Sequence, residues 1–330
     1  MNSLSRIMKP VFSVIILFLI STQVNSNSVQ NISENTNLTN LTNLTNLTNL
    51  TNLTNLTNLT NLTILTSPQD DYEKMKCSKK LKSFDKSLSS LPLNEVIIEA
   101  GKTFIGTPYV AGTLDENPGS ENVVIMITGL DCVTFVENAL IFSRLIKEGK
   151  TDFEDYKSEL ELIRYRGGKN TGYTSRLHYF SDWIYDNEQK GIVKDITKDI
   201  GGVPYDKTID FMSSHRNSYK QLSDNDENVN EMISIENNIN ARDIYYIPKE
   251  NIADVYDKLQ SGDIIGITSK IDGLDVAHTG YVYKQDGVAY LLNASLKDKQ
   301  VEISPMDLQD YLMGNPKQGG IIVARVMDVK

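Results

Sequence analysis

Cys132 is the residue best placed to act as a nucleophile, because it opens the almost continuously apolar run Val133–Ile146. The run predicts a buried helix that ends near Gly149. The first turn of a helix exposes unpaired backbone N–H groups and the positive end of the helix dipole. Both favour the thiolate, which is the nucleophilic form of cysteine. Free cysteine is also a common small buried hydrophobe, so this position alone leaves a packing role open.

The chain offers three histidines as partners for this thiol, namely His178, His215 and His278. His278 follows a turn and enters a predicted strand, which suits a positioned general base. His178 lies in a predicted helix, where it is either a packed residue or a substrate contact. His215 lies in a polar loop and is interpreted as structural. His278 is therefore the predicted base for Cys132.

A predicted β-hairpin brings Asn293 to His278. The strand that begins at His278 turns near Asp286-Gly287 and returns over Val288–Ala294. A two-residue loop places Asn293 diagonally opposite His278 and a four-residue loop places it directly opposite, so both registers put the two side chains on one face. Asn293 can then bond one imidazole nitrogen and leave the other for Cys132, as in a cysteine hydrolase.

The elements that must position these residues indicate an α+β fold. Helices come first along the chain and an antiparallel sheet follows. The predicted helices are 93–104, 132–148, 153–164 and 176–189, the last of them capped by Ser175. The predicted strands are 123–128, 264–268, 278–284, 288–294 and 320–326, whereas the acidic stretch 223–231 is predicted to be a solvated loop.

A loop rich in glycine and cations joins two of these helices. Arg164, Arg166, Lys169 and Arg176 surround it in a chain of net charge −10. Planar guanidinium groups bind carboxylates in bidentate fashion, so one interpretation is a wall that recognises carboxylates. The alternative is a solvated basic patch.

The N-terminal part predicts export. Residues 1–26 have the charged, apolar and small-residue order of a secretory signal. Residues 27–67 contain nine consecutive Asn-Leu-Thr units, whose period of three fits neither a helix nor a strand and predicts a disordered tether. Residues 68–330 are long enough for one domain with a substantial core. The predicted location is periplasmic or extracellular, with no membrane span once the signal is removed.

Composition and motifs argue against several other classes of protein. The net charge of −10 disfavours a nucleic-acid partner. With Cys77 and Cys132 as the two cysteines, the chain is not a disulfide scaffold, and a bridge between them would remove the nucleophile. Metal-binding spacings such as His-x-x-x-His or Cys-x-x-Cys are absent, as is Gly-x-Ser-x-Gly. We expect no metal and no other cofactor.

Several motifs together resemble a known family. The segments Gly106–Gly112 (GTPYVAG) and Leu130–Glu137 (LDCVTFVE) are similar to the Gly-x-Pro-Tyr and Asp-Cys blocks of the NlpC-type, papain-like cell-wall hydrolases. Four further segments resemble a narrower branch, the N-acetylmuramoyl-L-alanine amidase-like proteins: 164–169, 172–183, 261–265 and 274–280. These motifs span most of residues 93–326.

The resemblance implies a papain-like fold in which a helix carrying the cysteine packs on an antiparallel sheet carrying the catalytic histidine. It places Cys132 on the nucleophile, His278 on the base and Asn293 on the third polar position, where this branch often has histidine. Tyr109 falls on the tyrosine beside the cysteine. The resemblance also favours substrate contacts for Arg166, Tyr173, Ser175 and Arg176.

The implied activity is hydrolysis of the amide between N-acetylmuramic acid and L-alanine in peptidoglycan or muropeptides. One alternative is a D-glutamyl–diamino-acid endopeptidase, which uses the same chemistry on another bond. A second alternative is a non-catalytic muropeptide-binding surface protein displayed on the tether. The intact set of Cys132, His278 and Asn293 argues for an enzyme.

Overall fold

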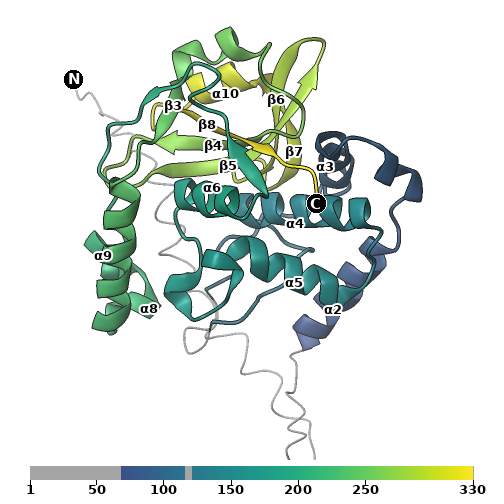
Figure 1. The fold of residues 1–330 in the computed structure, drawn as a ribbon, viewed down its shortest axis with the longest axis horizontal. Coiled ribbons are helices and arrows are strands. Elements are labelled where there is room, and N and C mark those ends of the chain that lie inside the picture. Colours follow the sequence, from purple (N-terminus) through teal and green to yellow (C-terminus); the bar gives the residue numbers. More distant parts are fainter. Residues whose placement is uncertain (1–67, 116–120, 330) are drawn as a thin grey trace, which may run out of the picture. The chain divides into compact units, whose positions relative to one another are not determined.

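An antiparallel β-sheet is the centre of the computed structural model, which describes residues 68–115 and 121–329 (Figure 1). The predicted signal peptide and the Asn-Leu-Thr repeat lie outside these residues. The sheet order is β2-β3-β8-β4-β5-β6-β7, and β1 also pairs with β8. The strands are β1 Val193–Asp195, β2 Val203–Pro204, β3 Tyr245–Pro248, β4 Ile264–Ser269, β5 Val276–Gln285, β6 Val288–Ser295, β7 Gln300–Asp307 and β8 Gln318–Val326.

Most helices precede the sheet in sequence. The α-helices are α2 Pro68–Leu81, α3 Leu93–Lys102, α4 Cys132–Glu148, α5 Phe153–Arg164, α6 Phe180–Gln189, α7 Phe211–Ser214, α8 Lys220–Ser223, α9 Asp226–Asn240 and α10 Leu308–Met313. Short 3-10 turns lie between them at 86–90, 166–168, 173–175, 216–218, 249–251 and 253–255. This mixture of helices with an antiparallel sheet confirms the predicted α+β class. Within the described residues, no helix is long and apolar enough to cross a membrane.

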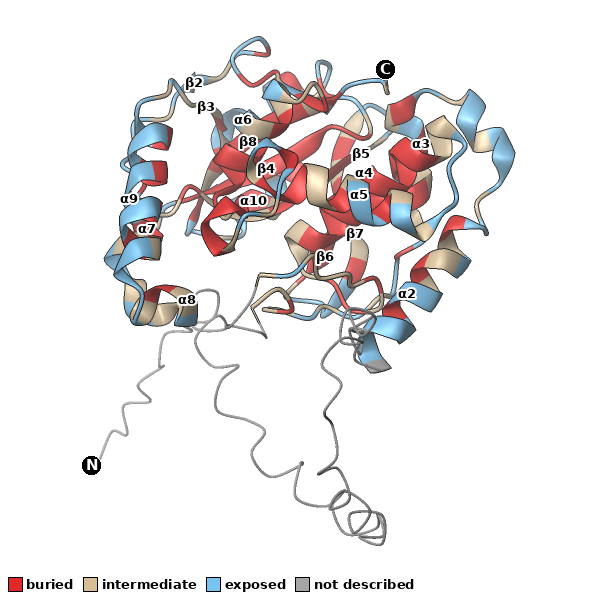
Figure 2. Cartoon of the chain, turned by 60° about the horizontal axis from the view of Figure 1, so that its bottom comes forward, coloured by how far each residue is buried: buried red, intermediate tan, exposed pale blue. Residues whose placement is uncertain are grey.

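The two faces of the sheet bury two separate apolar clusters, as the alternation of side chains along a strand requires. Tyr281 of β5 and Leu292 of β6 belong to the larger cluster, which also contains the apolar residues of α4. Their neighbours Val282 and Leu291 belong to the smaller cluster, on the face covered by α10. Figure 2 shows α4 and the central strands as mostly buried, while α9 exposes one side. The sheet is therefore enclosed on both faces at its centre.

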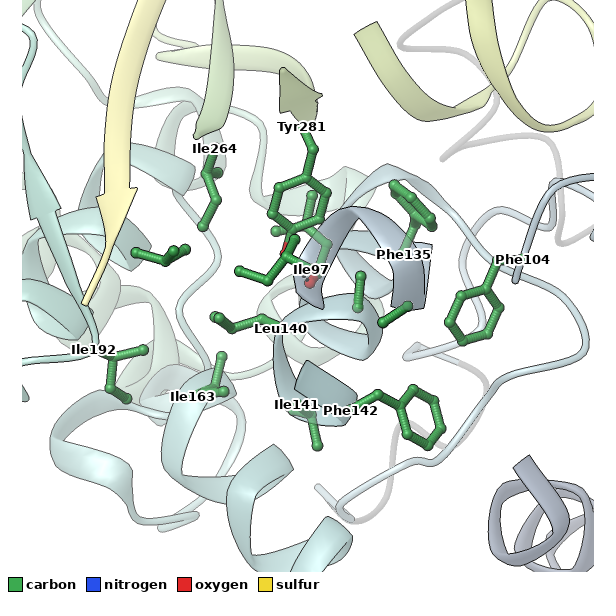
Figure 3. Packing of buried hydrophobic residues seen from close by; sticks show 14 of the residues in the cluster. Ile97, Phe104, Phe135, Leu140, Ile141, Phe142, Ile163, Ile192, Ile264 and Tyr281 are labelled. Atoms are coloured by element: carbon green, nitrogen blue, oxygen red, sulfur yellow. Dashed lines mark hydrogen bonds between the residues drawn. The ribbon is translucent and has the colours of Figure 1, made fainter. Parts of the chain in front are cut away.

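Helix α4 is buried along most of its length because apolar side chains surround it. Phe135, Leu140 and Tyr281 lie together in the core (Figure 3). The rings of Phe135 and Tyr281 meet edge to face, with centroids 6.0 Å apart. The Tyr281 hydroxyl donates a hydrogen bond of 2.7 Å to the carbonyl of Val136, so the phenol also satisfies a polar group. This bond ties the helix directly to β5.

A buried ion pair joins α4 to α5 and to the segment before the cysteine. The Nε and Nη2 atoms of Arg164 both donate to Glu137 Oε2, at 2.9 and 2.6 Å. Its Nη1 donates to the carbonyl of Val124 at 2.6 Å. Both side chains are at most 3% exposed, so each charge depends on the other.

Three sequence predictions of secondary structure were wrong. Residues 123–128 form no strand, because the Glu73 carboxylate takes the backbone N–H groups of Ile127 and Thr128 in place of a neighbouring strand. The predicted helix 176–189 begins only at Phe180. Ser175 does not cap it, since its hydroxyl donates to the Gly172 carbonyl.

The third error concerns 223–231, and the region after β6 carried no prediction. Part of the acidic stretch forms the start of helix α9. Asp226 and Glu227 lie in its first turn, where their carboxylates interact favourably with the positive end of the helix dipole. Strand β7 and helix α10 were not predicted, because Pro305 interrupts the strand pattern there.

We expect Glu137→Gln to lower the free energy of unfolding by about 3–5 kcal/mol, because Arg164 would remain buried without its counter-charge. The control is Glu154→Gln, which removes an exposed pair with Lys74 at 3.8 Å and should cost less than about 1 kcal/mol. Urea unfolding followed by circular dichroism measures both. Equal costs for the two variants would contradict the structural role given to the buried pair.

Candidate active site

Cys132 is the first residue of α4, and the capping of that helix fixes its position. Asp131 is the N-cap residue: its Oδ1 accepts from the Thr134 N–H at 2.8 Å, and its own N–H donates to Thr134 Oγ1 at 2.9 Å. This reciprocal pair is a capping box. The predicted end of the helix at Gly149 is confirmed, since Gly149 caps it with a φ of 68°.

The Cys132 sulfur is held as a thiol in the resting site. Burial is the main cause and the neighbouring Asp131 carboxylate is the second, and together they raise the pKa of Cys132 to about 12. Backbone N–H groups of Thr279, Cys132 and Val133 act in the opposite direction. The helix terminus therefore favours the thiolate, as expected, but burial and the Asp131 carboxylate outweigh its contribution.

The hairpin places His278 against Asn293, as the side-chain parity predicted. Gln285 pairs with Val288 around the two-residue Asp286-Gly287 turn, and both turn residues have positive φ. In this register Asn293 lies diagonally from His278, and Asn293 Oδ1 is 2.8 Å from His278 Nε2. Gly280 allows this close approach, since a Cβ there would lie 2.9 Å from the Asn293 Cβ.

The same contact determines which imidazole nitrogen carries the proton. The Asn293 amide nitrogen donates to the Leu291 carbonyl at 3.3 Å, which leaves Oδ1 as the acceptor toward the ring. His278 Nε2 must therefore be the protonated donor, and Nδ1 of the neutral ring is free to accept a proton. Burial lowers the pKa of His278 below its ordinary value of 6.5, and the bond from Asn293 opposes this.

Two tyrosines flank the cysteine. Burial raises the pKa of Tyr109, and the nearby Cys132 sulfur raises it further. Burial and Cys132 act in the same way on Tyr311. The Tyr311 ring is also nearly parallel to the His278 ring, at 22° and with 6.4 Å between centroids. Tyr311 was missed from the sequence because it lies on the short helix α10 (LQDYLM), where no motif distinguishes this tyrosine from a packing residue.

The glycine-rich loop is held by bonds within the chain. Arg176 pairs with Asp115 at 2.5 Å and with Glu121 at 3.4 Å, and its side chain is 6% exposed. Arg166 pairs with Asp182 at 2.6 Å. These arginines and Arg164 are therefore neither a solvated patch nor a row of free cations.

The other residues of this loop that were predicted to contact substrate, Ser175 and Tyr173, also have partners within the chain. The Ser175 hydroxyl donates to the Gly172 carbonyl at 2.6 Å and accepts from the Thr171 N–H at 3.0 Å. The buried Tyr173 ring packs on His178, with centroids 4.4 Å apart. His178 Nε2 is 2.8 Å from the Tyr173 carbonyl, and burial lowers its pKa well below the ordinary value.

The other histidine and cysteine have packing roles. His215 stacks on Phe211, with centroids 4.2 Å apart, and its Nδ1 is 2.9 Å from the Phe211 carbonyl. Cys77 and Cys132 are both free, so no bridge removes the predicted nucleophile. Cys77 is fully buried in the core, although the segment around it, Met75–Lys79, is rich in lysine. In residues 68–115 and 121–329, no group of three His, Cys, Asp or Glu side chains is arranged to hold a metal ion.

Replacing Asp131 by asparagine should make Cys132 more reactive toward iodoacetamide near pH 8. Asparagine caps helices as well as aspartate does, so α4 should still begin at Cys132. Loss of the carboxylate lowers the thiol pKa, and each unit of decrease multiplies the thiolate fraction by about ten. The rate of alkylation at Cys132 is followed by mass spectrometry, with Asp152→Asn at the start of α5 as the matched control. An unchanged rate in Asp131→Asn would contradict the electrostatic role of Asp131.

Comparison with known proteins places the chain in a family. Residues 99–321 match the AmiA-like family, described as N-acetylmuramoyl-L-alanine amidase-like. A solved N-acetylmuramoyl-L-alanine amidase from Bacteroides uniformis is 38% identical with a TM-score of 0.68, and the match covers 72% of this chain and 99% of that one. A Bacteroides fragilis structure described as a candidate xylanase is 35% identical with a TM-score of 0.65, covering 69% and 100% of the two chains.

A Legionella pneumophila protein shares the fold at 19% identity and a TM-score of 0.57, with 78% and 97% of the two chains covered. No curated protein matches the sequence. The family match spans more than half of the chain. The chain therefore belongs to the N-acetylmuramoyl-L-alanine amidase-like family.

Proposed function

We propose that the protein is a cysteine amidase of the papain-like, NlpC-type cell-wall hydrolases. It cleaves the amide between N-acetylmuramic acid and L-alanine, with Cys132, His278 and Asn293 as catalytic residues. The observation that carries this proposal is the bond of 2.8 Å between His278 and Asn293. The next residue after His278, Thr279, directs its backbone N–H at the Cys132 sulfur. The residue that follows His278 on β5 thus contacts the Cys132 sulfur, which supports a nucleophile, a base and an orienting group in one site.

The proton route follows from the protonation states. Cys132 rests as a thiol and His278 as a neutral imidazole with Nδ1 unprotonated. His278 Nδ1 takes the thiol proton as the sulfur attacks the carbonyl carbon of the scissile amide. The resulting imidazolium then protonates the leaving amine of L-alanine. In the second half-reaction His278 activates a water molecule, which hydrolyses the thioester to the Cys132 acyl group.

The helix terminus supplies donors for the tetrahedral oxyanion. The N-cap aspartate accepts from the Thr134 N–H and also from that of Val133, and the N–H groups of Cys132 and Val133 lie near the sulfur. Preorganised backbone donors of this kind stabilise charge that develops in the transition state. We assign the oxyanion site to the Cys132 N–H, with Tyr109 forming the wall of the cleft beside the sulfur.

Arg166, Tyr173, Ser175 and Arg176 act on the substrate through the shape of their loop. The guanidinium groups are engaged with chain carboxylates, and the Ser175 hydroxyl is engaged with backbone. We propose that these residues hold the loop as one border of the cleft. Direct recognition of a stem-peptide carboxylate by Arg176 would require release from Asp115 and Glu121.

The name of the Bacteroides uniformis relative favours the amidase over the D-glutamyl endopeptidase. Most glycoside hydrolases use a pair of carboxyl groups, whereas the residues gathered here suit acyl transfer, so a xylanase activity is disfavoured. A non-catalytic muropeptide-binding protein would not need the oriented imidazole. The family's association with the cell wall also agrees with export, through a signal at 1–26 and a tether at 27–67.

Cys132→Ala should abolish hydrolysis of muropeptides, whereas Cys77→Ala should keep it. Cys77 lies in the core, so its loss should cost about 1 kcal/mol of stability without changing the chemistry. Digests are analysed by mass spectrometry, where release of a peptide with an L-alanine N-terminus identifies the amidase. Release of a shorter peptide from within the stem would instead identify the endopeptidase. Turnover by well-folded Cys132→Ala would exclude Cys132 as the nucleophile.

The pH dependence of kcat/KM tests the orienting bond. Because the pKa of His278 lies below 6.5, activity should persist to below pH 6.5 and fall as His278 becomes protonated. The Asn293 bond raises this pKa, so Asn293→Ala should move the acid limb to lower pH while it lowers the maximum. His278→Ala should lose about 100- to 10,000-fold at every pH. A profile for Asn293→Ala identical to wild type would show that Asn293 does not orient the base.

A further inference from the structure

A groove of about 430 Å³ runs between α2 and the loops that precede the cysteine. Its cationic wall is formed by Lys76, Lys79 and Lys80 of α2, and its opposite wall by Thr107, Pro108 and Thr128. Residues three and four apart lie on one face of a helix, so the sequence spacing itself collects the three lysines. The groove is thus a positively charged site in a chain of net charge −10.

The three lysines lack ion pairs within the part of the chain that the structure describes. Lys74 of the same helix, by contrast, pairs with Glu154 at 3.8 Å. The buried Glu73 carboxylate of the same helix accepts from the backbone N–H groups of Ile127 and Thr128 and from the Thr128 hydroxyl, so its bonds are directed at the wall opposite the lysines. The three ammonium groups outnumber this one carboxylate, so the groove keeps a net positive charge.

Lys80 is the most enclosed of the three. Its Nζ lies 3.7 Å from the centroid of the Phe104 ring and donates to the Thr103 carbonyl at 3.0 Å. Burial lowers its pKa to about 8, so the ammonium is still mostly protonated at neutral pH. A partly buried cation without a counter-charge is destabilising, and an anion bound in the groove would offset that cost.

The groove lies close to the proposed nucleophile. Thr107 is two residues before Tyr109, and Thr128 is four residues before Cys132. Consecutive Cα atoms are about 3.8 Å apart, so the Thr128 Cα lies at most about 15 Å from that of Cys132. A disaccharide-peptide fragment bound at Cys132 is long enough to reach this distance. The family match begins at residue 99, so the lysines are contributed from outside it.

We propose that this groove is a subsite for an anionic group, a carboxylate or a phosphate, on the cell-wall fragment whose amide lies at Cys132. The inference rests on the proposed amidase function. Lys79 and Lys80 bind the anion by charge-assisted hydrogen bonds, and the Thr107 hydroxyl completes the opposite wall. Binding of the anionic group in the subsite lowers the KM of fragments that carry it, so the enzyme selects these fragments.

The test compares Lys76→Gln/Lys79→Gln/Lys80→Gln with Lys82→Gln/Lys86→Gln, which removes exposed lysines outside the groove. Calorimetry with inorganic phosphate as the probe reports binding without any catalysis. Phosphate should bind the wild type and the control and should not bind the triple variant. Melting temperatures identify a variant that fails to fold, and in that case the single variant Lys79→Gln replaces it.

Kinetics on defined fragments identify the source of the anion. If it is a stem-peptide carboxylate, the triple variant should raise KM about tenfold for the free acid, leave kcat unchanged and have no effect on the amidated fragment. If it is a phosphate, the rise should appear only for phosphate-bearing wall fragments. Equal phosphate binding and equal KM in the triple variant and the control would overturn the proposal. Phosphate binding without hydrolysis of any fragment by wild type would overturn the amidase function and this substrate role, and would leave only an anion site.

Discussion

The N-terminal cap of α4 is the constraint on which the candidate site depends. The reciprocal bonds between Asp131 and Thr134 fix the first residue of the helix, and that residue is Cys132. The N–H groups of Cys132 and Val133 lie beside the sulfur, and that of Val133 also bonds the Asp131 carboxylate. This carboxylate nevertheless disfavours a thiolate, so the cap positions the nucleophile and also keeps it protonated. In the mechanism that we propose, attack is therefore coupled to proton transfer to His278.

The rest of the fold holds this helix terminus against the hairpin. The Glu137–Arg164 pair fixes α4 to α5 and, through the Val124 carbonyl, to the segment before the cysteine. The Tyr281 hydroxyl bonds the Val136 carbonyl and so sets the helix against β5. Since His278 lies three residues before Tyr281 on that strand, the core packing and the position of the base are linked.

Features set by local patterns could be predicted from the sequence, and features set by distant partners could not. The meeting of His278 and Asn293 follows from strand alternation around a two-residue turn, which sequence parity describes. The partners of Arg176, by contrast, lie 55 and 61 residues away in Glu121 and Asp115, so its burial left no local signal. The protonation of Cys132 is a balance of opposing effects that only the folded environment decides.

In the mechanism that we propose, the Cys132 sulfur becomes acylated by the muramoyl group. Acid quenching of the enzyme during turnover of a muropeptide, followed by mass spectrometry of its tryptic peptides, measures this directly. We expect a thioester adduct with the mass of the N-acetylmuramoyl acyl group on the tryptic peptide that contains Cys132. An adduct of a stem-peptide fragment would contradict the assigned bond. Turnover without an adduct on Cys132, together with activity in Cys132→Ala, would contradict the cysteine mechanism.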